Sequence, residues 1–241
     1  SEKFDYLAEG EILTLVYTVR VTDSNSPATT ADQTITITIT GTNDAPTITI
    51  GSGNSAAAAL TETSTTLTST GTLTVTDLDY TNTVTASVAS VVASGVIAGI
   101  IPNNATLLAM LAVTPTSILS NSATTAILTW NFNSGSEAFN YLATGEQVVL
   151  TYVVRATDSN GTPTSGTRNV IITITGTNDA PVISGSAPTT VAQGVLYSFT
   201  PTVLDVDANT TLRACIAGTA PVVSDEADLN GDFGCVIDGG D

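Results

Sequence analysis

The sequence predicts an all-β protein made of antiparallel β-sandwich domains in tandem. Two observations carry this prediction: a composition that favours strands, and a long internal repeat whose copies alternate apolar and polar residues. Hydrophobic residues make up 42% of the 241 residues, but aromatic residues only 5%. The core must therefore rest on Val, Ile, Leu and Ala, with Thr and Ser at the alternate positions, and this mixture favours strands.

The repeat is visible as one motif that occurs twice. Residues 4–11, Phe-Asp-Tyr-Leu-Ala-Glu-Gly-Glu, return as residues 139–146, Phe-Asn-Tyr-Leu-Ala-Thr-Gly-Glu, at an offset of 135 residues. The offset holds without a gap through Gly-Thr-Asn-Asp-Ala-Pro, which occupies residues 41–46 and again residues 176–181. Such self-similarity indicates modules of one type in series.

Each copy contains two segments with the period of a half-buried strand. In the first copy, apolar residues occupy every second position of residues 13–21, and Ile alternates with Thr over residues 35–40. Because successive side chains of a strand point to opposite faces, one face of each segment is expected to be buried. The turn-rich run at residues 23–27 separates the two segments. Each copy is therefore expected to end in two strands joined by a loop, like the last two strands of a sandwich.

The segment between the copies supplies the rest of one complete domain. Residues 73–75, 83–88 and 126–132 have the pattern of short strands, and Trp130 is expected to anchor the core. Residues 103–111, which begin Asn-Asn-Ala-Thr and continue with an apolar run, predict one short capped helix packed over one end of this central domain.

The two prolines that close the copies predict the domain boundaries, since a proline ends a strand and forces an extended entry into the next module. We predict the C-terminal half of one domain at residues 1–46, a complete domain at residues 47–181, and the N-terminal part of another at residues 182–241. The half-domains mark either fragment boundaries or the joints of a polymer.

Charge and residue types exclude several functions. Five basic residues against 22 acidic ones give a formal charge of −17, so nucleic acid is excluded as a partner, because phosphate recognition needs clustered Lys and Arg. The chain has no histidine, which removes Ser-His-Asp and Cys-His catalysis and His-ligated zinc. An enzyme would have to use carboxylates alone, as glycosidases do, and these carboxylates lie in linker motifs. We expect that the protein is not an enzyme.

Two further features bear on the environment of the chain. Cys215 and Cys235 suit either one loop-closing disulfide or two free thiols. No apolar run reaches the roughly 20 residues that a membrane span requires, so we expect no membrane insertion.

Several motifs in a fixed order resemble the VCBS repeat of giant bacterial surface proteins and RTX-type adhesins and, more distantly, cadherins. They are Leu-Thr-Trp-Asn-Phe at residues 128–132, the motif at residues 139–146, Tyr-Val-Val-Arg-Ala-Thr-Asp at residues 152–158, and the linker at residues 176–181. The resemblance covers residues 1–181. Residues 192–207 are similar to a bacterial Ig-like, or dystroglycan-type cadherin-like, module.

The resemblance implies Ig-like or cadherin-like sandwiches with Ca²⁺ at their junctions. Ca²⁺ takes about six to eight hard oxygen ligands, so a junction needs several carboxylates from separate loops. Carried over by position, the first junction would gather Glu11, Asn43, Asp44, Asp77, Asp79 and Asp158. The second would gather Glu62, Glu146, Asn178, Asp179, Asp205 and Asp207. Asp23 occupies the position of Asp158 and would serve a junction upstream.

Two departures from the cadherin pattern suggest fewer or weaker ions. Gly41 and Gly176 stand where a cadherin linker has an additional Asp, and Gln193 stands where the central domain has Glu62. The alternative role for each loop Asp is an Asx-turn or a helix cap.

The resemblance further implies a secreted protein of the bacterial surface, acting as a structural extender of an adhesin or of an extracellular fibre. Its partners would be neighbouring domains or subunits of the same protein, and the half-domains would allow a head-to-tail homopolymer. The alternative is a ligand- or carbohydrate-binding adhesion module with a glycan or surface receptor as partner. That function needs an exposed aromatic platform, for which Tyr6 and Tyr80 are the candidates.

Overall fold

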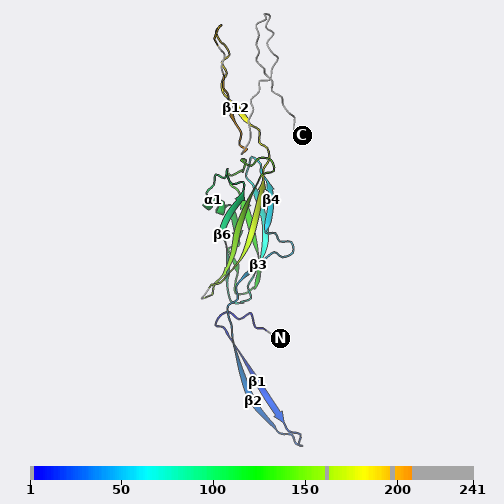
Figure 1. Cartoon of the computed structure of the whole chain (residues 1–241). Coiled ribbons are helices and arrows are strands. Elements are labelled where there is room, and N and C mark those ends of the chain that lie inside the picture. Colours follow the sequence, from blue (N-terminus) through cyan, green and yellow to red (C-terminus); the bar gives the residue numbers. More distant parts are fainter. Residues whose placement is uncertain (1–2, 161–162, 196–198, 208–241) are drawn as a thin grey trace. The chain divides into compact units, whose positions relative to one another are not determined.

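The computed structural model describes residues 3–160, 163–195 and 199–207. The chain divides into two compact units, Ser1–Asn178 and Asp179–Asp241, which are considered separately below. Figure 1 shows the strands of each unit and a short helix in the first unit.

The first unit begins with a hairpin of two long antiparallel strands, β1 (Ile12–Thr22) and β2 (Thr30–Thr40). The two strands form a sheet by themselves, and no other strand of the described chain pairs with either (Figure 1). The alternating segments of the first copy therefore form strands as predicted, but the second layer of a sandwich does not cover them.

The rest of the first unit is a sandwich of two sheets. The five-stranded sheet has the order β4-β11-β10-β6-β8 and the four-stranded sheet the order β3-β5-β9-β7. The strands of the larger sheet are β4 (Ala57–Thr61), β6 (Val84–Gly95), β8 (Ser117–Leu119), β10 (Gln147–Asp158) and β11 (Ser165–Thr175). Those of the smaller sheet are β3 (Thr47–Thr49), β5 (Thr68–Thr76), β7 (Leu111–Thr114) and β9 (Thr125–Asn133). The prediction of an all-β sandwich is confirmed.

One strand pair departs from the antiparallel pattern. β3 pairs antiparallel with β5, and the chain then crosses to the other sheet, where β4 runs parallel to β11 from Ala57–Ile171 to Thr61–Thr175. The crossing lets consecutive residues close both sheets on the same side of the sandwich.

The core consists of the inward-facing positions of both sheets. Trp130 on β9 is fully buried, and its indole Nε1 donates to the Ser55 carbonyl at 2.7 Å. Gly71 on β5 makes room for this ring, since a Cβ there would lie 2.4 Å from Trp130 Cζ2. Tyr152 on β10 is also fully buried, with its ring edge-to-face against Phe132 at a centroid distance of 6.4 Å. Trp130 is thus the core anchor that the sequence predicts.

The predicted helix is α1 (Asn104–Ala109). Asn103 caps it through a side-chain oxygen that accepts from the Thr106 amide at 3.0 Å. The helix is shorter than predicted, because Leu111 turns inward as the first residue of β7. Within the described chain, no helix has the length and hydrophobicity needed to cross a membrane.

The described part of the second unit contains the antiparallel pair β12 (Val182–Ser184) and β13 (Thr202–Leu204). This pair repeats β3 and β5, since both pairs follow an Ala-Pro linker and precede an Asp-x-Asp motif. Cys215 and Cys235 lie outside the described residues, so their pairing stays open.

Candidate metal centre

The six residues selected for the first junction come from four places in the first unit. Glu11 lies immediately before β1, Asn43 and Asp44 in the linker after β2, Asp77 and Asp79 in the loop after β5, and Asp158 at the end of β10. The hydrogen bonds below connect five of these six residues directly or through a shared partner, and they link Glu11 to the loop after β5. The structure thus brings this set together.

Asp77 and Asp79 form the most buried part of the centre, with 2% and 1% of their surfaces exposed. The Asp79 amide donates to Asp77 Oδ1 at 3.1 Å, and the Asp44 amide donates to Asp79 Oδ2 at 2.8 Å. The remaining oxygens, Asp77 Oδ2 and Asp79 Oδ1, are buried and accept no hydrogen bond from the described residues. Such oxygens are costly to bury unless a donor or a cation meets them.

Asn43 links the linker to the end of β10. Its Nδ2 donates to Asp158 Oδ2 at 3.1 Å and to Thr164 Oγ1 at 2.9 Å. Its Oδ1 accepts from Asn82 Nδ2 at 3.1 Å and from Asn160 Nδ2 at 2.7 Å. The side chain is thus held by two loops of the sandwich, which fixes the linker against them.

Glu11 bridges the start of the hairpin and the loop after β5. Its Oε2 accepts from the Ala8 amide at 3.0 Å, and its Oε1 accepts from Thr81 Oγ1 at 2.9 Å. Nearby, the Tyr80 amide donates to the Tyr6 carbonyl at 3.2 Å.

The electrostatics of the centre favour a cation. Burial raises the pKa of Asp77 to about 6, against the Asp79 amide that lowers it, and the charges of Asp79, Asp158 and Asp44 raise it further. Burial also raises the pKa of Asp79, against the Asp44 amide, with Asp44, Asp158 and Glu11 as the neighbouring charges. A nearby positive charge would reverse both effects, because it favours the ionised carboxylates.

Asp158 behaves differently. Burial alone would raise its pKa, but hydrogen bonds from Thr164, Asn43 and Asn160 outweigh burial and lower the pKa. Hydrogen bonds of the protein itself therefore keep Asp158 ionised.

The donor set fits an oxygen-liganded cation in part. Carboxylate and amide oxygens are the ligands that Ca²⁺ takes, and two of the carboxylate oxygens have no other partner. Three or more acidic side chains do not converge on one cation position among the described residues. Glu11, Asp44, Asp77, Asp79 and Asp158, with the Asn43 amide oxygen, stay the predicted ligands, and their side chains would have to move closer together to hold one ion.

The selection from the sequence missed four side chains of this network, which are Thr81, Asn82, Asn160 and Thr164. Thr81 donates to Glu11 at 2.9 Å, and Asn160 donates to Asn43 at 2.7 Å. Asn82 is 7% exposed and donates to both Asn43 and Asp79, at 3.1 Å in each case. Thr164 donates its amide and its hydroxyl to Asp158. Asn82 stands three residues after Asp79, and an asparagine in a loop belongs to no distinctive sequence pattern. Thr164 could have been found from the repeat, because Thr29 stands at the same position in the first copy.

The second set of six residues divides between the two units. In the first unit, Glu62 Oε1 accepts from the Thr177 amide at 2.9 Å and from the Thr177 hydroxyl at 2.6 Å. Glu146 Oε2 accepts from the Ala143 amide at 3.1 Å, which repeats the Glu11–Ala8 contact. Asn178 is the last residue of this unit.

In the second unit, Asp179, Asp205 and Asp207 repeat the local geometry of the first junction. The Asp207 amide donates to Asp205 Oδ1 at 3.0 Å, and the Asp179 amide donates to Asp207 Oδ2 at 3.0 Å. The matching contacts at the first junction join Asp79 to Asp77 and Asp44 to Asp79. Convergence of the whole second set stays a prediction.

The structure explains the glycine that opens each linker. A Cβ on Gly41 would lie 2.3 Å from the Ala8 carbonyl oxygen, and a Cβ on Gly176 would lie 2.2 Å from that of Leu142. The backbone of the turn before each hairpin therefore excludes the additional Asp of the cadherin linker.

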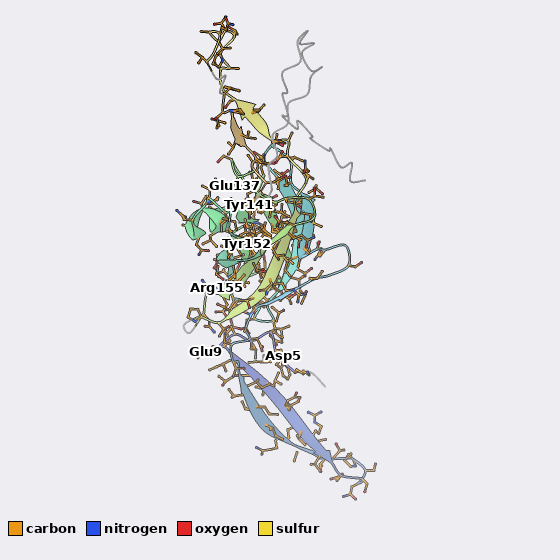
Figure 2. The ribbon with its side chains drawn as sticks, turned by 45° about the horizontal axis from the view of Figure 1, so that its top comes forward. Asp5, Glu9, Glu137, Tyr141, Tyr152 and Arg155 are labelled. Atoms are coloured by element: carbon orange, nitrogen blue, oxygen red, sulfur yellow. The ribbon has the colours of Figure 1, made fainter. Side chains whose placement is uncertain are left out.

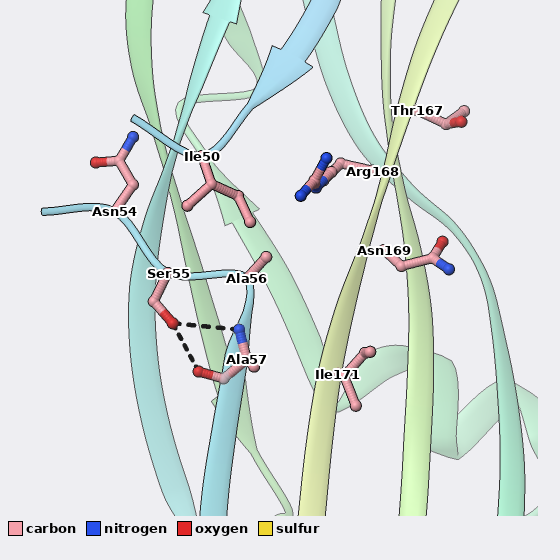
Figure 3. A pocket seen from close by; sticks show the side chains of 9 residues that line it. All are labelled: Ile50, Asn54, Ser55, Ala56, Ala57, Thr167, Arg168, Asn169 and Ile171. Carbon is pink, nitrogen blue, oxygen red and sulfur yellow. Dashed lines mark hydrogen bonds between the residues drawn. The ribbon is translucent and has the colours of Figure 1, made fainter. Parts of the chain in front are cut away.

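An open pocket of about 650 Å³ lies where the chain crosses from β3 to β4 (Figure 3). Arg168 points into the gap between β11 and residues 54–57. The Ser55 hydroxyl donates to the Ala57 carbonyl and accepts from the Ala57 amide. Arg168 is the one charged residue among those that line this pocket. The lining therefore offers no pair of carboxylates for acid–base chemistry.

Comparisons with known proteins find only distant structural similarity. No family model matches the chain, and no curated protein matches it. The protocadherin GammaB4 extracellular domain is 14% identical over 81% of this chain and 29% of its own, with a TM-score of 0.39. Human CDH23 EC21-23 is 15% identical over 81% of this chain and 59% of its own, also with a TM-score of 0.39. This chain spans less than two thirds of either cadherin chain.

A pilin shows similarity of the same order. The CooA pilin subunit from enterotoxigenic Escherichia coli is 16% identical over 57% of this chain and 100% of its own, with a TM-score of 0.32. Similarities this weak establish neither the family nor the function of this chain.

Proposed function

We propose that the chain is a structural extender of a secreted bacterial surface adhesin or extracellular fibre, in which Ca²⁺ bound between adjacent modules fixes one module against the next. One observation carries the proposal. At the first junction, residues selected as ligands from the sequence gather in one network and leave Asp77 Oδ2 and Asp79 Oδ1 buried with no hydrogen-bond partner. The bacterial surface and secretion rest on the motifs shared with VCBS repeats.

The chain's own residues would act by position and charge. Asn43 and Asp44 belong to the linker, whereas Asp77, Asp79 and Asp158 belong to the sandwich, so one ion held by both would tie the two modules together. A bound Ca²⁺ supplies positive charge and coordination to oxygen ligands. Without it, the buried carboxylates repel one another and weaken the junction.

The partners in this proposal are neighbouring modules or subunits of the same protein, including a head-to-tail homopolymer. No catalytic step is part of it.

Removal of calcium tests the proposal. In calcium buffer the melting temperature should exceed that in chelator, and free calcium at 100 times its Kd would add about 2.7 kcal/mol to the free energy of unfolding. Small-angle scattering should show a more flexible particle in chelator. Mg²⁺ should substitute poorly, because it demands a tighter octahedral geometry. Identical melting and scattering profiles with and without calcium would refute the proposal.

A further inference from the structure

The hairpin β1–β2 and the strand pair β10–β11 have the same register. Leu13 pairs with Ile39 as Val148 pairs with Ile174, and Thr22 pairs with Thr30 as Thr157 pairs with Ser165. Each pair of the hairpin is thus matched by a pair 135 residues later. The strand pair β10–β11 therefore shows the surroundings in which a hairpin of this sequence pattern packs.

The apolar face of the hairpin is exposed where its counterpart is buried. Tyr17 is 51% exposed and Ile37 45%, whereas Tyr152 and Ile172 at the matching positions are 0% exposed. The same contrast holds for Val19, Val21 and Ile35 against Val154, Ala156 and Val170. Figure 2 shows the hairpin side chains projecting from both faces of a single layer. An isolated two-stranded hairpin is marginally stable in water.

The second copy shows what covers such a face. β6 pairs antiparallel with the edge of β10 that faces away from β11, and this pairing places Val91 opposite Tyr152. β4 pairs parallel with the other edge of β11 and places Ala58 opposite Ile172. The smaller sheet closes the face from above, with Phe132 against Tyr152. All of these partners belong to the segment from β3 to β9, residues 47–133.

The loop at the hairpin tip repeats the loop that binds a linker in the second copy. Asp23 Oδ1 accepts from the Asn25 and Thr29 amides, both at 3.1 Å, and Asp23 also accepts from the Thr29 hydroxyl. Asp158 makes the same three contacts with Asn160 and Thr164. Asp158 and Thr164 then receive Asn43 of an Asn-Asp linker. Asp23 and Thr29 present the same acceptors.

We propose that the apolar face of β1–β2 and the Asp23 loop together form the docking surface for a front segment of the same repeat type as residues 43–135. That segment begins with an Asn-Asp linker whose Asn donates to Asp23 and Thr29. Its β6-type strand adds antiparallel to β1 with a Val opposite Tyr17, and its β4-type strand adds parallel to β2. This inference rests on the proposed function, because it identifies the neighbouring module that completes the hairpin. The docking itself needs no calcium.

The test supplies such a segment to the full chain. A second copy of residues 43–135 is joined directly ahead of Ser1, and amide hydrogen exchange is measured in the fused and unfused proteins. Fusion should slow exchange over residues 12–22 and 30–40 by about 100-fold or more, towards the rates of β10 and β11. Exchange in β10 and β11 should not change, which verifies that the original sandwich stays folded.

A matched control carries Val91→Asp in the added copy alone. A carboxylate opposite Tyr17 would be buried without a partner, so the hairpin should exchange as fast as in the unfused protein. The proposal is overturned if the wild-type fusion leaves the hairpin unprotected or if the control protects it equally. It is also overturned if the unfused chain is a dimer in which the two hairpins protect each other, because the face would then bind another hairpin and not a front segment. All measurements are repeated in chelator. Protection of the hairpin that persists there would support docking even if the chain binds no calcium.

Discussion

At the scale of single residues, Asp77 shows most clearly that the candidate metal centre buries carboxylates whose charges repel one another. It is buried beside other carboxylates, and burial raises its pKa to about 6, with Asp79, Asp158 and Asp44 as the surrounding charges. Its Oδ2 has no hydrogen-bond partner among the described residues. A protein that keeps such a group must meet its charge with a proton or with a cation.

This conflict predicts an unusual pH dependence in the absence of metal. Because the folded pKa of Asp77 lies above the unfolded value, its proton stabilises the fold below about pH 4, and this contribution is lost as the pH rises through about 6. In chelator, the free energy of unfolding should therefore fall over this range, by an amount on the order of 1–3 kcal/mol. Urea unfolding at a series of pH values measures this fall in the free energy of unfolding.

Asp77→Asn is the control for this pH effect, since it keeps the shape of the side chain and removes the titration. The fall between pH 4 and 6 should shrink in this variant, and calcium should abolish it in the unmodified chain by holding Asp77 ionised. A free energy of unfolding that rises with pH by the same amount in both proteins would contradict the assignment.

At the scale of the elements, the two repeat copies provide matched positions in different environments. The hydroxyl of Tyr152 on β10 donates to the Leu107 carbonyl of α1 at 2.9 Å inside the core, whereas the matching Tyr17 on β1 is half exposed. Tyr152→Phe removes this hydrogen bond, although the Leu107 carbonyl still accepts from the Met110 amide at 3.2 Å. The loss should cost about 0.5–1.5 kcal/mol in the free energy of unfolding. Tyr17→Phe should change it by no more than about 0.5 kcal/mol.

The fluorescence of Trp130 reports this unfolding, because it is the one tryptophan of the chain and lies in the sandwich core. Equal losses in the two variants would show that the hydroxyl of Tyr152 does not tie the helix to the sheet.

The elements that the sequence predicted well are those with a strict period. The alternation of Ile and Thr over residues 35–40 and its repeat in β11 can satisfy only a strand, so both pairs were identified. The crossing from β3 to β4 was not predicted, because residues 56–59 are four consecutive alanines and carry no alternation. Leu111 was assigned to the helix because a short apolar run fits either type of element.

For the candidate site, repeated linkers and Asp-x-Asp motifs mark the ends of strands, so the first set of six residues could be selected from the sequence. That these residues bind an ion stays a prediction. The sequence did not indicate Asn82, whose role depends on a loop conformation that brings it to both Asn43 and Asp79. It also gave no reason for Gly41, which follows from the backbone of the preceding turn. Contacts between loops depend on their three-dimensional course, and a pattern along the chain does not encode that course.

At the scale of the whole molecule, we propose that carboxylates from a linker and from the next sandwich share an ion. The hydrogen bonds from Asp44 to Asp79 and from Asn43 to Asp158 join these parts in the first unit. The second unit repeats the first contact between Asp179 and Asp207. The same local contact between a linker Asp and an Asp-x-Asp motif thus occurs in both units.

Calorimetric titration of Ca²⁺ into the chelator-stripped chain measures whether the centre binds the ion. The intact chain should bind calcium, and Asp79→Asn should lose one class of site, because it removes a charge from the centre and replaces one of its oxygens. Asp32→Asn is the matched control, since Asp32 is an exposed carboxylate paired with Arg20 on the hairpin, and it should bind as the unmodified chain does. Absence of binding to the intact chain, or the same stoichiometry and affinity in Asp79→Asn, would show that this centre does not bind calcium.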